Sequence, residues 1–152
     1  MVEDSNKAVD ILLADDNEND VELTLRAFRK HRIVNSMHVV RDGKEALEYL
    51  FCTDRYAHRN IADLPKVLLL DVKMPFVDGI EVLRRVRANP HTHELPVVML
   101  TSSSLDRDAI ECYDLGVNSY IVKPVDFEQF HEAAGVIGFY WLMLNKPRPH
   151  DD

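Results

Sequence analysis

The apolar run Val67–Leu70 constrains the fold most, because it is continuously apolar and is followed directly by an acidic residue, Asp71. A strand that is apolar on both faces is typical of a parallel sheet with helices packed on either side. Two further apolar runs, at 11–14 and 97–100, are also followed by polar residues. We therefore expect buried strands whose polar ends meet at one edge of a sheet.

Segments with a helical spacing of apolar residues alternate with these runs. The spacing of three or four residues recurs at 20–31, 46–50, 80–88, 106–115 and from 126 onward, and two further strands are expected at 37–40 and 119–122. Five strands alternating with five helices predict a doubly wound α/β sheet that binds ligands at the carboxyl ends of its strands.

The length of 152 residues suits one domain. We expect a single domain over residues 1–152, with its core at about 9–144 and terminal tails at 1–8 and 145–152. The segment 52–65 has no clear periodicity and is expected to be an extended surface connection.

Charge and composition exclude several classes of protein. The net charge of −8, without a basic stretch, argues against binding nucleic acid. An acidic N-terminus is unlike a signal peptide, and no apolar run approaches the roughly 20 residues that span a bilayer. Two cysteines without a CxxC spacing fit a reducing compartment, so we expect a cytoplasmic protein that does not enter a membrane.

The strand ends carry the candidate chemistry. Asp15 and Asp16 follow the first strand and Asp71 ends the third, so their carboxylates are expected to converge. Carboxylates that repel one another suit a hard divalent cation such as Mg²⁺. Thr101 and Lys123 end the next two strands, and their hydroxyl and ammonium groups suit phosphoryl oxygens.

This set of residues resembles the receiver domains of two-component response regulators, in the same order and at matching strand ends. The residues that carry the resemblance are Asp15-Asp16, Asp71, Met74-Pro75, Asp78-Gly79, Thr101, Tyr120 and Lys123-Pro124. The resemblance implies a flavodoxin-like, CheY-like fold with the strand order 2-1-3-4-5. It also implies a phosphoacceptor signalling domain rather than an enzyme.

The resemblance assigns a role to each residue. Asp71 is the phosphoacceptor for a sensor histidine kinase, and Mg²⁺ (or Mn²⁺) is held by Asp16, Asp71 and the backbone carbonyl of Lys73, with Asp15 acting through a water. Lys123 pairs with the phosphoryl group, while Thr101 and Tyr120 move to form the switch. The Lys123-Pro124 peptide bond is expected to be cis.

Two further positions are expected to set the lifetime of the acyl phosphate. Lys73 and Ser103 lie two residues after Asp71 and Thr101. A cationic Lys73 cannot orient a hydrolytic water as an acceptor would, so slow self-dephosphorylation is expected.

A narrower resemblance links the chain to the small receivers that partner bacterial phytochromes. It rests on the segments 52–65, 89–96, 117–120 and the aromatic stretch 139–142. It implies a phytochrome-type kinase as partner, and a homodimer formed through the fourth helix, the fifth strand and the fifth helix.

The sequence also bears on three other functions. An aspartate-based phosphatase of the haloacid-dehalogenase type needs a second acid two residues after the nucleophile, where this chain has Lys73. A flavodoxin-like electron carrier needs a phosphate loop after the first strand, where Asp15 to Asp20 would repel phosphate. A receiver-fold adaptor that works without phosphorylation is the remaining alternative.

Overall fold

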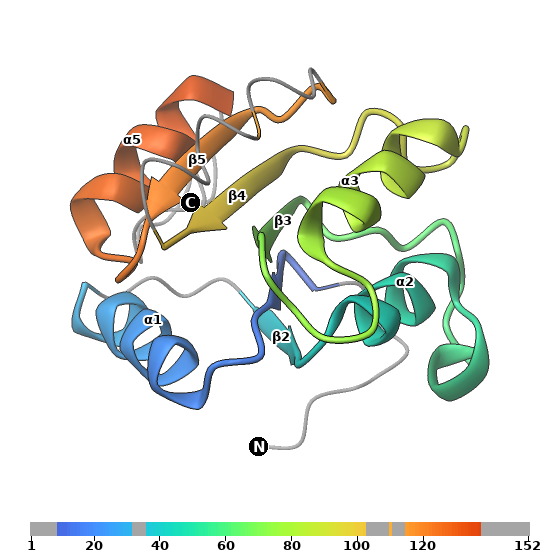
Figure 1. Cartoon of the computed structure of the whole chain (residues 1–152), viewed down its shortest axis with the longest axis horizontal. Helices are drawn as coiled ribbons and strands as arrows, with labels where there is room; N and C mark the ends of the chain where they lie inside the picture. Colours follow the sequence, from blue (N-terminus) through green and yellow to red (C-terminus); the bar gives the residue numbers. More distant parts are fainter. Residues whose placement is uncertain (1–8, 32–35, 103–109, 111–114, 138–152) are drawn as a thin grey trace, which may run out of the picture.

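The computed structural model describes residues 9–31, 36–102, 110 and 115–137. Strands and helices alternate along these residues, as Figure 1 shows. They are β1 (Ile11–Ala14), α1 (Glu18–Lys30), β2 (Met37–Val40), α2 (Gly43–Phe51), the 3-10 helix η1 (Asp54–Tyr56), β3 (Val67–Asp71), α3 (Gly79–Ala88), β4 (Val97–Thr101), β5 (Ser119–Val122) and α5 (Phe127–Ile137).

The five strands form one parallel sheet in the order β2-β1-β3-β4-β5. The predicted order 2-1-3-4-5 is therefore confirmed. The register pairs Ala14 with Leu70 and Asp71 with Leu100, so these strands end almost level with one another. Level strand ends bring the residues that follow them to a single edge of the sheet.

Helices cover both faces of the sheet, with α1 and α5 on one side and α2 and α3 on the other (Figure 1). Side chains of β3 alternate between the two resulting cores. Leu68 and Leu70 belong to the core under α2 and α3, whereas Val67 and Leu69 belong to the core under α1 and α5. This double burial explains why the run Val67–Leu70 is apolar throughout.

Three helices begin within a few residues of a strand or turn because a polar side chain caps each of them. In each case the side chain accepts a hydrogen bond from the backbone N–H three residues later, which satisfies one of the free donors at the helix start. The caps are Asn17 for α1, Asp42 for α2 and Asp78 for α3. The first cap fixes the start of α1 beside the polar end of β1.

The connection between α2 and β3 is more ordered than the expected extended loop. It contains η1, and the Arg59 side chain within it is buried, with 5% of the residue exposed. The Arg59 guanidinium lies 3.7 Å from the centre of the Tyr49 ring and donates hydrogen bonds to the Tyr49 and Asp63 carbonyls. The cation–π contact and the two hydrogen bonds of Arg59 together hold this connection against α2.

Some predictions fall outside the described residues. They are most of the fourth helix (106–115), Ser103, and the aromatic stretch 139–142. Four α-helices lie within the described ranges, and the last of them, α5, is described as far as Ile137. None of the helices in these ranges combines the length and apolar character that a membrane span requires.

Candidate functional site

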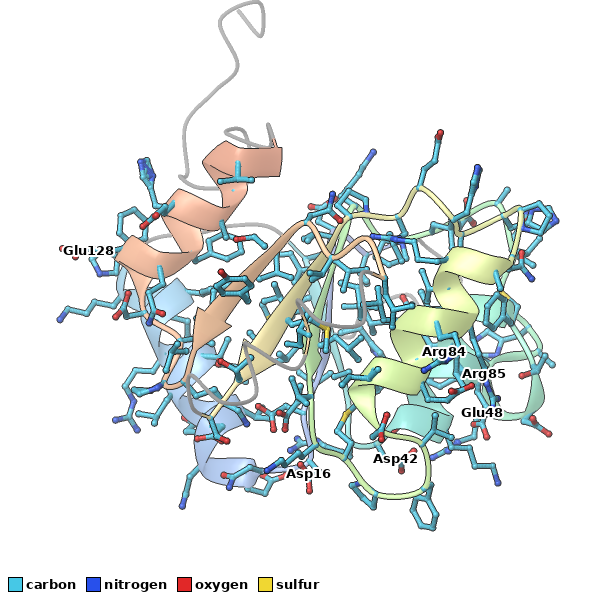
Figure 2. All side chains as sticks on the ribbon, turned by 45° about the horizontal axis from the view of Figure 1, so that its top comes forward. Asp16, Asp42, Glu48, Arg84, Arg85 and Glu128 are labelled. Carbon is cyan, nitrogen blue, oxygen red and sulfur yellow. The ribbon has the colours of Figure 1, made fainter. Side chains whose placement is uncertain are left out.

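Three carboxylates meet where β1 and β3 end. Asp15 and Asp71 are buried, with 0% and 5% of their surfaces exposed, while Asp16 faces solvent. Each of the three carboxylates offers one oxygen, and these three oxygens lie within 4.8 Å of one another. Figure 2 labels Asp16 on the side of the molecule toward which the arrows of β4 and β5 point. The predicted convergence of Asp15, Asp16 and Asp71 is thus present.

The Lys123 ammonium lies among the acids. Its Nζ is 3.1 Å from Asp71 Oδ2, 3.2 Å from Asp15 Oδ2 and 2.8 Å from Asp20 Oδ2. Lys123 reaches this position because its backbone N–H donates to the Thr101 carbonyl at 2.8 Å, which continues the pairing of β4 and β5. The Lys123-Pro124 peptide bond is cis, as expected.

Burial shifts the protonation equilibria of this site. Burial and, after it, the neighbouring Asp15 carboxylate raise the pKa of Asp71 to about 7, although the Lys123 charge opposes the shift. Burial alone would lower the pKa of Lys123, but the hydrogen bond to Asp20 and the charges of Asp15 and Asp71 raise it above its ordinary value. The ammonium therefore stays charged, and Asp71 is the group whose charged form burial destabilises.

Thr101, the last residue of β4, carries a buried hydroxyl. The residue is fully buried, and its Oγ1 finds no hydrogen-bond partner within the described part of the chain. Buried hydroxyls nearly always have a partner, because leaving one unpaired is costly. An unpaired donor at this edge of the sheet fits an oxygen-rich ligand that arrives later.

The loop after Asp71 folds back against the strand end. The Lys73 N–H lies 3.4 Å from Asp71 Oδ1, and the Gly79 N–H donates to the Val72 carbonyl at 2.8 Å. A β-carbon on Gly79 would lie 2.0 Å from the Asp71 carbonyl oxygen, so only glycine fits this approach. The close approach holds the backbone of Lys73 beside the Asp71 carboxylate.

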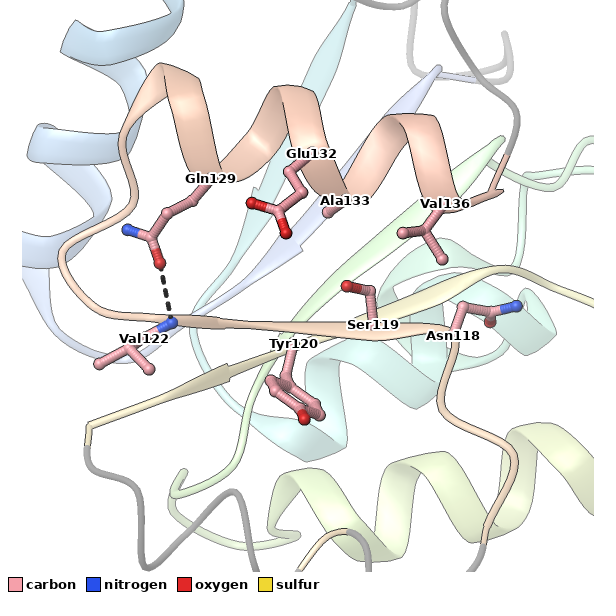
Figure 3. Close-up of a pocket in the computed structure, with 8 residues that line it drawn as sticks. All are labelled: Asn118, Ser119, Tyr120, Val122, Gln129, Glu132, Ala133 and Val136. Carbon is pink, nitrogen blue, oxygen red and sulfur yellow. Dashed lines mark hydrogen bonds between the residues drawn. The ribbon is translucent and has the colours of Figure 1, made fainter.

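Tyr120 is the second residue of β5. It is partly buried against the core under α2 and α3, and it lines a hollow of about 430 Å³ beside β5 and α5. Figure 3 shows its ring on the opposite side of β5 from Ser119 and Glu132. Its predicted role as a switch remains a prediction.

One residue of the site was not predicted from the sequence. Asp20, in the first turn of α1, makes the shortest of the three contacts to Lys123 Nζ. The available signal was its position, because a helix that starts directly after the Asp15-Asp16 turn presents its first turn to the same edge of the sheet.

Comparison with known proteins identifies the family. The family model described as the response regulator receiver domain matches residues 11–135. The chain therefore belongs to the response regulator receiver domain family, as the strand-end residues predicted. Domains of this family serve in signalling with sensor histidine kinases and bind a divalent metal at an acidic cluster.

Three similar proteins illustrate the relationship. The probable methanogenesis regulatory protein FilR2 of Methanothrix harundinacea is 38% identical over 136 residues, which is 90% of this chain and 85% of that protein. The solved structure of the bacteriophytochrome response regulator AtBRR is 46% identical, with a TM-score of 0.84, and the match covers 92% of this chain and 99% of AtBRR. The Mn²⁺-bound form of response regulator Rcp1 is 32% identical, with a TM-score of 0.69 and coverage of 91% and 98%.

Proposed function

We propose that this chain is a single-domain response regulator that accepts a phosphoryl group on Asp71 from a phosphohistidine of a sensor histidine kinase. The observation that carries the proposal is the juxtaposition of a buried Asp71 carboxylate and the Lys123 ammonium 3.1 Å away. The Thr101 hydroxyl at the end of the neighbouring strand, which has no hydrogen-bond partner among the described residues, supports it. The domain transmits a signal and is not an enzyme with a substrate of its own.

The transfer is a displacement at phosphorus. An Asp71 carboxylate oxygen forms the new bond to phosphorus while the bond from phosphorus to the imidazole nitrogen breaks, and that nitrogen takes up a proton from solvent. Lys123 pairs with a phosphoryl oxygen, and the Thr101 hydroxyl donates to another. Tyr120 then changes its position on β5 and carries the change to the surface.

The acidic cluster suits Mg²⁺, or Mn²⁺ in its place, because hard cations prefer carboxylate and carbonyl oxygens. Asp16, Asp71 and the Lys73 carbonyl would hold the ion, with Asp15 acting through a water. When bound, the ion supplies the positive charge that allows the carboxylates and a phosphoryl group to share the site. The similarity of this chain to Rcp1, which has a solved Mn²⁺-bound form, supports a divalent ion as its ligand.

The kinase that we propose as donor is of the phytochrome type, and both proteins would lie in the cytoplasm. The similarity to AtBRR, a bacteriophytochrome response regulator, supports this partner. We further propose a homodimer through the fourth helix, β5 and α5, because Val122 and Val136 are exposed beside the hollow on this face. Exposed apolar groups that lie together commonly mark an interface.

An intact-mass experiment tests the proposal. The protein is incubated with acetyl phosphate and Mg²⁺, and the wild type is expected to gain the mass of one phosphoryl group. Asp71→Asn and a sample with chelator should gain none, while the control Asp54→Asn, an exposed residue with a positive φ of 49° that asparagine also tolerates, should behave as wild type. An unmodified wild type would favour the alternative, an adaptor that works without phosphorylation.

Light scattering on the same samples tests the dimer. A particle mass that doubles on phosphorylation would support a homodimer that depends on the switch. Phosphorylation that leaves the particle mass of a monomer unchanged in light scattering would overturn phosphorylation-linked dimerisation. It would leave the phosphoacceptor role of Asp71 intact.

A further inference from the structure

Asp20 contacts the Lys123 ammonium from the helix side of the site. Its Oδ2 lies 2.8 Å from Nζ, closer than the oxygens of Asp15 and Asp71, and 26% of its side chain is exposed. The Asn17 side chain accepts the Asp20 N–H at 3.0 Å, and the Asp20 carbonyl accepts the Thr24 hydroxyl at 2.9 Å. The backbone of Asp20 is therefore fixed, and its carboxylate is directed at Lys123.

Asp20 stands apart from the cluster suited to a cation. The group of oxygens within 4.8 Å of one another comprises Asp15, Asp16 and Asp71, and it does not include Asp20. A cation at that cluster would offset the charges of Asp15 and Asp71 but would leave the Asp20 carboxylate facing the ammonium. Lys123 would then retain one strong counter-charge, Asp20, when a phosphoryl group arrives.

We propose that Asp20 is a positioning residue that holds the Lys123 ammonium toward α1 and competes with the phosphoryl group for it. This inference rests on the proposed phosphoacceptor function. An ammonium shared with a carboxylate presents less positive charge to a phosphoryl oxygen, and the Asp20 carboxylate itself repels the anion. Asp20 thereby weakens the hold on a phosphoryl group and keeps the unphosphorylated arrangement of Lys123 favoured.

Beryllium fluoride, an analogue of the phosphoryl group, gives a direct measurement. Its affinity is determined by calorimetric titration of the full chain at saturating Mg²⁺. Asp20→Asn keeps the size and an acceptor oxygen but removes the charge, and it should bind the probe about fivefold more tightly, because a charge-assisted hydrogen bond is replaced by a neutral one. Asp20→Ala should change the affinity in the same direction.

Glu18→Gln is the matched control. Glu18 is another acid in the first turn of α1, but it is exposed and pairs with Arg41 rather than with Lys123. Its substitution removes the same charge from the same helix end, so a general effect of helix charge would appear equally in both variants. We expect Glu18→Gln to change the affinity for beryllium fluoride by less than about twofold.

A second readout separates positioning from loss of structure. The Mg²⁺ affinity of Asp20→Asn should stay within about threefold of wild type, since Asp20 lies outside the cluster, whereas Asp16→Asn should lower it at least about tenfold. Unchanged or weaker binding of beryllium fluoride by both Asp20 variants would overturn the proposal, as would an equal gain in Glu18→Gln. A wild type that neither binds beryllium fluoride nor gains a phosphoryl group from acetyl phosphate would instead refute the phosphoacceptor function.

Discussion

The Arg87 guanidinium at the end of α3 joins the Asn118 side chain at the start of β5, with Nη2 donating to Oδ1 at 3.0 Å. The same guanidinium donates to the Gly116 carbonyl at 2.7 Å and to the Leu95 carbonyl at 2.7 Å. Asn118 Oδ1 also accepts the Val97 N–H at 2.8 Å. One side chain thus links α3, the start of β4 and the start of β5, at the opposite edge of the sheet from Asp71.

Arg87→Lys should lower the free energy of unfolding by about 1–2 kcal/mol, because an ammonium cannot make the forked contacts of a guanidinium and leaves carbonyls unpaired. Urea unfolding followed by circular dichroism measures the change. The control is Arg85→Lys on the same helix, where an exposed arginine pairs with Glu81 and a change below about 0.5 kcal/mol is expected. Equal losses of unfolding free energy in Arg87→Lys and Arg85→Lys would show that the hydrogen bonds of Arg87 add no stability of their own.

Thr101 and Thr92 are two buried threonines that differ in the hydrogen bonding of their hydroxyls. Both residues are fully buried, but Thr92 Oγ1 donates to the Val86 carbonyl at 2.6 Å, whereas Thr101 Oγ1 has no partner in the described part of the chain. Thr101→Val should therefore raise the free energy of unfolding by about 1 kcal/mol, and Thr92→Val should lower it by about 1–2 kcal/mol.

The same Thr101→Val variant should hold beryllium fluoride less tightly than wild type, because the donor for a phosphoryl oxygen is lost. If Thr101→Val is more stable than wild type but binds beryllium fluoride less tightly, the Thr101 hydroxyl serves ligand binding and not folding. Destabilisation by Thr101→Val would mean that the hydroxyl is already paired in the resting protein.

Much of the fold could be predicted from the sequence, because apolar periodicity reports burial directly. The run at Val67–Leu70 indicated a strand buried on both faces, and the two cores on either side of β3 account for it. The connection between α2 and β3 could not be predicted, since its order comes from the buried Arg59 on Tyr49. Such a contact depends on tertiary packing and leaves no periodic signal.

The convergence of Asp15, Asp16 and Asp71 could be predicted for a different reason. Parallel strands that end level with one another deliver the following residues to one edge, so chain order alone brings these acids together. Asp20 could not be found in this way, because its contact with Lys123 depends on the rotation of α1 and on the side chain's direction. The direction of a side chain in the first turn also depends on the residue at which the helix begins, here set by the Asn17 cap, and the apolar pattern does not fix that residue.

The buried Asp71 carboxylate should make the metal-free protein sensitive to pH. Its pKa is raised to about 7 by burial and by Asp15, above the ordinary value of about 3.9, so the folded state binds the proton more strongly than the unfolded state. The contribution of Asp71 to stability is present below pH 4 and is lost as the pH rises to about 7.

Asp71→Asn should therefore be more stable than wild type at pH 8 in the presence of chelator, by on the order of 2 kcal/mol, and the difference should shrink toward pH 5. Thermal unfolding at several pH values measures it, with Asp54→Asn as the control for loss of an acid away from the site. Mg²⁺ should reduce the stability difference between Asp71→Asn and wild type at pH 8, because an ion that binds only the folded wild type stabilises it. A stability difference between the two proteins that is the same at pH 5 and pH 8 would contradict the raised pKa of Asp71.

Phe76 follows Asp71 in the loop before α3 with φ at +68° and 84% of its surface exposed. A left-handed backbone costs a residue with a β-carbon about 1–2 kcal/mol, and asparagine tolerates it better than most. Since an exposed ring loses little packing, Phe76→Asn should raise the free energy of unfolding by about 0.5–1 kcal/mol, measured in urea. Phe76→Ala removes the ring but keeps the unfavourable backbone, so it should gain less than Phe76→Asn. Equal effects of the two substitutions would show that the ring, and not the backbone, determines the stability at this position.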